Sequence, residues 1–269
     1  LALRPAGSGQ IVQENSAGND IGWCPRSYLT GLTLSRASAT TIGIAIGLCR
    51  DGTDVTNLRL ASAFTKSTSA WAVGTANGGG LDGALPASAT WYRVFLILRS
   101  DTGVVDVGFD SGATATLPTG YDYSRQIGWV RTDATPNFIA FNQVGNYFLW
   151  DVTVEDLDAT PNSNLAASAI LTVPPDIVTA HIRVTLVDPT TAGSHVLISA
   201  PVIADAAPSL TAAPGTSLTA ITANTEEANE LSILTAGSGS IRYRLSATDA
   251  DLRLIIWTYG WTDNRGREA

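Results

Sequence analysis

Residues 91–110, WYRVFLILRSDTGVVDVGFD, contain the clearest secondary-structure signal in this sequence. Trp91–Leu98 is a nearly continuous run of large apolar residues, and Ser100–Gly103 has the composition of a tight turn. In the return arm, Val105–Asp110, apolar side chains alternate with Asp and Gly, which is typical of a half-buried strand. The stretch predicts a β-hairpin whose first arm is central in its sheet and whose return arm exposes its acidic side.

The same alternation of period two recurs along most of the chain. In Ile42–Cys49, isoleucine and leucine alternate with glycine, alanine and cysteine, so this strand has one bulky face and one small face. Further strands, separated by Gly, Asn and Asp turns, are expected at 125–131, 138–143, 147–154, 169–173, 181–187, 196–203, 231–235, 241–247 and 252–259. The sequence therefore predicts an all-β protein made of two β-sandwich, jelly-roll-like domains with antiparallel sheets.

Breaks in the alternation predict the domain organisation. Residues 1–20 are rich in Gly, Ser, Asn and Gln without periodicity, and they predict an extended N-terminal arm or linker. Glu155–Asn162 is acidic, contains a proline and lacks a period, so we expect a boundary there, between a first domain at 21–156 and a second at 157–269. Asp205–Glu230 predicts a long loop with room for one short helical turn, and loops of this length usually have a role, such as contact with a neighbouring molecule.

The composition argues against several functional classes. Of the 269 residues, 45% are hydrophobic and 15% are charged, which indicates a folded chain whose weakly charged surface suits packing against other proteins. The net charge of −8 disfavours nucleic acid, because phosphates repel this overall sign. The longest apolar runs, such as Val94–Leu98, are far shorter than the roughly 20 residues that span a bilayer. We therefore expect no membrane insertion, and Leu1–Pro5 does not open a signal peptide.

Catalytic and metal-binding constellations are not expected. With only two cysteines, Cys24 and Cys49, the chain has neither a disulfide framework nor a four-cysteine metal site. We expect both as reduced thiols, with a single disulfide between them as the alternative. The two histidines, His181 and His195, fall in or beside strand patterns, and the adjacent Ser194 lacks the surroundings of a nucleophile elbow.

A pair of carboxylates could still hydrolyse glycans. Asp106 and Asp110 share one strand face, but four residues at about 3.3 Å each separate their backbones by roughly 13 Å. That separation is too large for either glycosidase geometry. We therefore expect no enzymatic activity, no catalytic residue, no bound metal and no cofactor.

Aromatic side chains are the best candidates for ligand contact, because sugars stack on exposed Trp and Tyr rings, which cost little entropy to order. The competing interpretation is that these rings close hydrophobic cores or subunit interfaces. The candidate residues are Tyr121, Tyr123, Trp129, Tyr259 and Trp261. Arg265 and Arg267 in the C-terminal tail are candidate interface residues, because arginine is a frequent interface anchor.

Several short stretches form a longer pattern. They are Gly31–Ser35, Gly78–Gly83, Thr90–Ile97, Asp106–Asp110, Leu117–Tyr121, Arg125–Gly128, Phe141–Gly145 and Gly260–Arg267. In this order, over most of residues 30–150 and the C-terminal tail, the chain resembles bacteriophage tail-fibre and tail proteins. Two positions, Arg93 and Gln126, depart from the pattern of that group.

The resemblance implies a place on the virion, which we expect in the phage tail, and a homotrimer. The strand Leu252–Trp257 is apolar enough to be buried on both faces, so we expect Leu252–Arg267 to contribute to the trimer contacts. The alternative is that this strand completes the sheet of the second domain and its aromatic residues cap that core. We expect a tail-fibre or baseplate component that contributes to host attachment, with other virion proteins and a host-surface glycan or protein as partners. One alternative is a head-fibre, capsid or tail structural element without receptor binding. A second alternative is a glycan-binding or glycan-degrading tailspike domain. An exposed aromatic-rich tip favours attachment, and a groove lined by carboxylates favours the tailspike.

Overall fold

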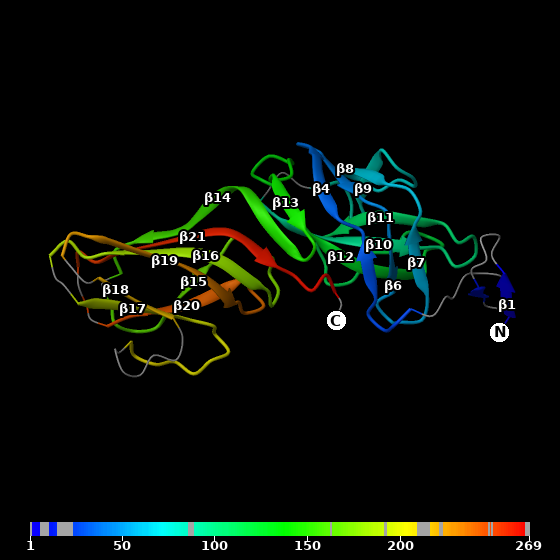
Figure 1. Cartoon of the computed structure of the whole chain (residues 1–269). Coiled ribbons are helices and arrows are strands. Elements are labelled where there is room, and N and C mark those ends of the chain that lie inside the picture. The colour runs from blue at the N-terminus through cyan, green and yellow to red at the C-terminus, as the bar shows by residue number, and fades with distance from the viewer. Residues whose placement is uncertain are drawn as a thin grey trace. The chain divides into compact units, whose positions relative to one another are not determined.

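A computed structural model describes residues 2–5, 11–14, 24–85, 89–161, 163–190, 193–208, 216–220, 223–246, 248 and 250–266. Over these residues the chain forms strands, turns and loops and no helix, so the predicted all-β, sandwich-like fold is confirmed (Figure 1). Correspondingly, this part of the chain offers no helix long and apolar enough to cross a membrane.

The chain divides into two compact units, and their limits differ from the predicted ones. The first unit comprises 1–145 together with 264–269, and the second comprises 146–263. The predicted boundary at Asp156 falls inside strand β14 (Tyr147–Ala159) and was misplaced. The register of β14 against its neighbour shifts between Glu155 and Leu157. This β-bulge interrupts the alternation of period two, which is why the segment looked like a linker.

The first unit contains one large mixed sheet and one small antiparallel sheet. In the large sheet the strand order is β12-β10-β11-β9-β8-β5-β4, and in the small sheet it is β3-β6-β7. The strands of the unit are β3 (Leu29–Gly31), β4 (Leu34–Ser38), β5 (Thr41–Ile44), β6 (Gly47–Arg50), β7 (Asn57–Leu60), β8 (Phe64–Ala70), β9 (Asn77–Gly80), β10 (Trp91–Leu98), β11 (Val105–Asp110), β12 (Tyr123–Arg131) and β13 (Phe141–Val144).

The predicted hairpin is confirmed as β10 and β11, and β10 lies between β11 and β12, as expected for a central strand. The predicted exposure of its acidic side is wrong. Asp106 and Asp110 are both buried. Asp106 forms an ion pair with Lys66, and Asp110 accepts hydrogen bonds from the backbone amides of Gly112 and Thr116. Asp106 is therefore kept inside by a residue distant in sequence, and Asp110 by the loop that directly follows β11.

Near the N-terminus, β1 (Ala2–Pro5) pairs antiparallel with β2 (Ile11–Glu14). The sequence predicted an aperiodic arm over 1–20, and this short hairpin corrects that expectation for the two segments described. The other residues of the predicted arm lie outside the described part of the chain.

The second unit contains two antiparallel sheets, with strand orders β14-β21-β16-β19 and β15-β20-β17-β18. Alternate residues of both are buried, among them Ile182, Val184, Val196 and Ile256. Besides β14, its strands are β15 (Ala167–Ile170), β16 (Thr179–Val187), β17 (Ser194–Ser199), β18 (Thr216–Ala220), β19 (Glu226–Leu234), β20 (Ser240–Leu245) and β21 (Arg253–Thr262).

The segment Asp205–Glu230, predicted as a loop, contains β18 and the first half of β19. The sequence gives little sign of β19 because Glu226–Glu230 has no apolar residue on either face other than an alanine. β19 is the last strand of its sheet, so most of these side chains face solvent and need no apolar partner.

Candidate functional site

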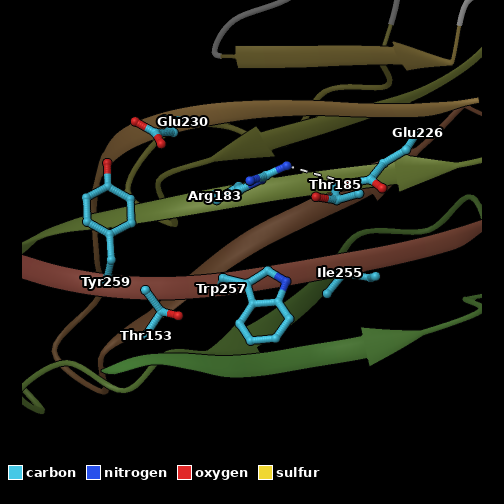
Figure 2. A pocket seen from close by; sticks show the side chains of 8 residues that line it. All are labelled: Thr153, Arg183, Thr185, Glu226, Glu230, Ile255, Trp257 and Tyr259. Carbon is cyan, nitrogen blue, oxygen red and sulfur yellow. Dashed lines mark hydrogen bonds and ion pairs between the residues drawn. The ribbon is translucent and has the colours of Figure 1, made fainter. Parts of the chain in front are cut away.

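The second unit carries a groove of about 560 Å³ on the exposed face of the sheet β14-β21-β16-β19. Figure 2 shows the side chains that line it, contributed by all four strands. They are Thr153, Arg183, Thr185, Glu226, Glu230, Ile255, Trp257 and Tyr259. Aromatic, charged and hydroxyl groups are thus gathered on one sheet surface.

Cross-strand pairing explains how the polar groups come to lie beside the aromatic ring of Trp257. Directly paired residues of an antiparallel sheet project from the same face. Trp257 of β21 is paired with Glu155 of β14 on one side and with Arg183 of β16 on the other. Arg183 is in turn paired with Glu230 of β19. One row across the sheet therefore reads carboxylate, indole, guanidinium, carboxylate.

Tyr259 reaches the groove because β21 bulges at this residue. The pairing of β21 with β16 passes from Thr258 directly to Gly260, and its pairing with β14 does the same. Tyr259 therefore has no opposite residue in either ladder, and the inward-facing positions of the strand shift by one beyond it. A bulge of this kind re-aims side chains and is common beside functional sites.

The same bulge sends Trp261 into the hydrophobic core. Its side chain is completely buried and stacks on Phe148, with 4.9 Å between ring centroids and 4° between planes. Gly260 is required at the bulge, because a Cβ atom at this position would collide with the backbone carbonyl of Phe148. Two aromatic residues only two positions apart thus lie on opposite faces of the sheet.

The charges of the groove are mostly exposed. Nη2 of Arg183 lies 3.5 Å from Oε1 of Glu226, and the two side chains are 52% and 60% exposed. Burial raises the pKa of Tyr259, and the negative charge of Glu230 raises it further. Figure 2 shows the Tyr259 hydroxyl directed towards Glu230. The lining residues therefore contribute two carboxylates and one guanidinium.

Two further rings, those of His181 and Tyr147, lie next to Tyr259 outside the groove lining. The imidazole of His181 lies 6.1 Å from the ring of Tyr259 and 4.5 Å from the ring of Tyr147. Its two nitrogens form hydrogen bonds of 2.8 Å with the hydroxyls of Ser232 and Thr262. Burial lowers the pKa of His181, so this ring adds an aromatic surface and no positive charge near neutral pH.

Of the five aromatic residues predicted as candidates, Tyr259 alone lines this groove. Tyr121, Trp129 and Trp261 are buried in cores, as the competing interpretation expected. Tyr123 is half-buried on β12, in the first unit.

Arg265, a predicted interface residue, is buried within its own chain. Its guanidinium donates hydrogen bonds to the backbone carbonyls of Ile127 (2.8 Å), Gly31 (3.1 Å) and Leu32. It is therefore engaged inside the first unit, which corrects its proposed role. Arg267 lies outside the described residues.

The sequence interpretation missed Trp257, Arg183, Glu226 and Glu230 as site residues. A signal for Trp257 existed, because Arg253, Ile255, Trp257 and Tyr259 alternate with buried residues on one strand. The strand seemed apolar enough to be buried on both faces, and this concealed its exposed face.

His195, Ser194 and the two cysteines lie outside the groove lining. The hydroxyl of Ser194 donates to the buried carboxylate of Asp188, whereas His195 shares a hydrogen bond of 2.7 Å with Thr219. Cys49 is buried, which raises its thiol pKa to about 12, and it forms no disulfide with Cys24. Across the described residues, no group of three or more His, Cys, Asp and Glu side chains is placed to hold a metal ion.

Comparison of the chain with known protein families and with curated protein sequences gives no match.

Proposed function

We propose that this chain is a non-enzymatic component of a phage particle, in the tail fibre or baseplate, and that its second unit binds a host-surface glycan. The binding proposal rests on the presence of two aromatic side chains, Trp257 and Tyr259, side by side in the groove on the exposed face of β21. Exposed aromatic rings offer flat apolar surfaces for sugar rings at a small cost in entropy. The place on the virion and a homotrimeric assembly rest on the resemblance to tail proteins.

The polar rim of the groove suits a polyhydroxylated ligand. The carboxylates of Glu226 and Glu230 accept hydrogen bonds from sugar hydroxyls, and the guanidinium of Arg183 donates to sugar oxygens. The hydroxyl of Thr153 can do both. Thr153 is part of the irregular stretch of β14 between Leu149 and Val154, where the register shifts and the side chain turns towards the groove.

The groove has both the aromatic rings that favour attachment and the carboxylates that favour a tailspike hydrolase. The spacing of the carboxylates supports binding. Glu226 and Glu230 are four residues apart on one strand, so their backbones are about 13 Å apart, and Arg183 lies between their side chains in Figure 2. Hydrolysis needs two carboxyl groups about 5–9.5 Å apart across a glycosidic bond.

The test is calorimetric titration of the purified chain with polysaccharide from the host envelope. We expect saturable binding that Trp257→Ala weakens about tenfold or more, since one stacked aromatic ring contributes roughly 1–3 kcal/mol. Tyr123→Ala is the matched control, because Tyr123 is a half-buried ring of the other unit. The proposal fails if no host glycan binds, if Trp257→Ala binds as the unmodified chain does, or if the glycan is shortened during the titration.

A further inference from the structure

We infer that the saccharide held in this groove carries protonated amino groups, so that the site selects an amino sugar over N-acetylated and acidic sugars. The inference rests on the proposed glycan binding and adds the chemical class of the ligand. It follows from the charge of the groove and from the way the same chain holds an ammonium group elsewhere.

The charge of the groove is negative where a ligand would lie. Glu226 and Glu230 stand on the β19 side of the aromatic pair, and Glu155 is paired with Trp257 on the β14 side. Arg183 is the one cation among the lining residues, and its guanidinium is already directed at Glu226. Within the described part of the chain, no basic side chain comes within ion-pair distance of Glu230.

Glu230 therefore presents a carboxylate near the hydroxyl end of the Tyr259 ring. Its negative charge acts on the rings nearby, because it raises the pKa of both Tyr259 and Tyr147 after the larger effect of burial. A cation placed over Trp257 or Tyr259 would be attracted by the ring and by this carboxylate together. A neutral sugar would use only the hydrogen bonds and the stacking.

In the first unit, a carboxylate and an aromatic ring together hold an ammonium group. Nζ of Lys66 lies 2.8 Å from the carboxylate of Asp106 and 5.4 Å from the centre of the Trp71 ring. A carboxylate and an indole thus hold the one lysine of this chain. Glu230, Trp257 and Tyr259 offer the same two kinds of group, but on an exposed surface.

An acidic sugar meets the opposite situation. A uronate placed on Trp257 would approach the carboxylates of Glu155 and Glu230, which repel its negative charge. Arg183 is the one cation of the groove lining that could compensate, because Arg253, which lies near enough to Glu155 to interact with its charge, is paired with Asp158. N-acetylation removes the positive charge of an amino sugar, so the acetylated form keeps the stacking and loses the attraction to Glu230.

The experiment compares three oligosaccharides of equal length by calorimetry on the full chain: a glucosamine oligomer, its N-acetylated form and a uronate oligomer. We expect the glucosamine oligomer to bind about tenfold more tightly than the acetylated one, a factor that corresponds to one cation–π contact with a nearby carboxylate. Its affinity should also fall as salt is added. The uronate oligomer should bind most weakly.

Two variants separate charge from stacking. Glu230→Gln should remove the preference, so that the glucosamine and acetylated oligomers bind with about the same affinity, whereas Trp257→Ala should weaken the binding of both. Glu227→Gln, on the same strand and outside the groove lining, is the control for the loss of one negative charge.

The outcomes also separate the two proposals. If the acetylated or the uronate oligomer binds as tightly as the glucosamine oligomer and Trp257→Ala weakens it, glycan binding stands and the inferred charge selectivity is overturned. If none of the three oligomers binds and the host polysaccharide also fails to bind, both proposals are overturned.

Discussion

Two ion pairs, one in each unit, have the same chemistry and opposite surroundings. Lys66 and Asp106 of the first unit are 0% and 1% exposed, and their charged atoms are 2.8 Å apart. Arg183 and Glu226 of the second unit are about half exposed and 3.5 Å apart. The first pair is enclosed by protein, whereas the second lies on a surface open to a ligand.

The hydrogen bonds around each pair show what the difference means. Lys66 also donates to the carbonyl of Ala72 at 2.7 Å, and Asp106 accepts from the amides of Gly74 at 2.7 Å and Val107 at 2.6 Å. A buried ion pair needs such additional bonds, because each ion loses its hydration. Burial lowers the pKa of Lys66, and the contact with Asp106 opposes that change. The buried pair is a structural element, and the exposed pair can exchange its contacts with a ligand.

Breaking the buried pair should have the largest effect on stability. Lys66→Met leaves the Asp106 carboxylate buried without its counter-ion, and we expect the free energy of unfolding of the first unit to fall by about 3–5 kcal/mol. Chemical denaturation followed by tryptophan fluorescence measures this change. Arg183→Met is the matched control, since it removes the cation of the exposed pair. Equal losses in the two variants would contradict the distinction between the pairs.

The two tryptophans of β21 extend the comparison to aromatic residues. Trp261→Ala removes a fully buried ring that stacks on Phe148, and we expect a loss of about 3 kcal/mol in the stability of the second unit. Trp257→Ala removes a half-buried ring from the groove, and we expect a smaller loss of stability together with the loss of glycan binding. Denaturation and calorimetry on both variants test this. A Trp261 variant that is as stable as the unmodified chain would contradict the bulge at Tyr259.

These two residues also show how far the sequence could be interpreted. Alternation of period two was sufficient to predict the all-β class and the β10–β11 hairpin, because local patterning dictates which face of a strand is apolar. It failed at the bulge, where Tyr259 and Trp261 share a parity in the sequence and lie on opposite faces. Gly260 was the one local sign of that bulge, since a glycine inside a strand marks a close approach of backbones.

Contacts between residues far apart in the sequence were the second feature that the sequence did not reveal. Asp106 looked solvent-exposed because nothing in its own strand indicates that Lys66 is its partner. The groove depends likewise on Arg183, Glu230 and Trp257, which three strands distant in sequence bring into one row. Pairing of this kind is determined by the topology of the sheet, and a single sequence does not display it.

Substitution of Arg265 distinguishes a C-terminal tail that stabilises its own unit from one that forms a trimer interface. Arg265→Met leaves the carbonyls of Gly31, Leu32 and Ile127 without their donor, and we expect a loss of about 2 kcal/mol in the stability of the first unit. The oligomeric mass measured by light scattering should remain unchanged. A variant of full stability with a reduced oligomeric mass would restore Arg265 to the interface. Truncation after Gly260 is a poorer test, because it also removes the core residue Trp261.

The smallest change in stability is expected at the exposed pair itself. Arg183→Gln should alter the free energy of unfolding by less than about 1 kcal/mol, because water and salt screen an ion pair between half-exposed side chains that are 3.5 Å apart.

The same substitution, Arg183→Gln, should strengthen the binding of a cationic ligand. Loss of the guanidinium leaves Glu226 and Glu230 as an uncompensated negative pair, so the affinity for a glucosamine oligomer should rise and its dependence on salt should steepen. Calorimetry at two salt concentrations measures both quantities, with Arg253→Gln as the control, since Arg253 pairs with Asp158 outside the groove lining. If Arg183→Gln instead abolishes binding of the cationic oligomer, the hydrogen bonds from the guanidinium to the sugar outweigh its repulsion of the ligand's charge. The exposed pair is then a fixed part of the binding site and not one that a cationic ligand can displace.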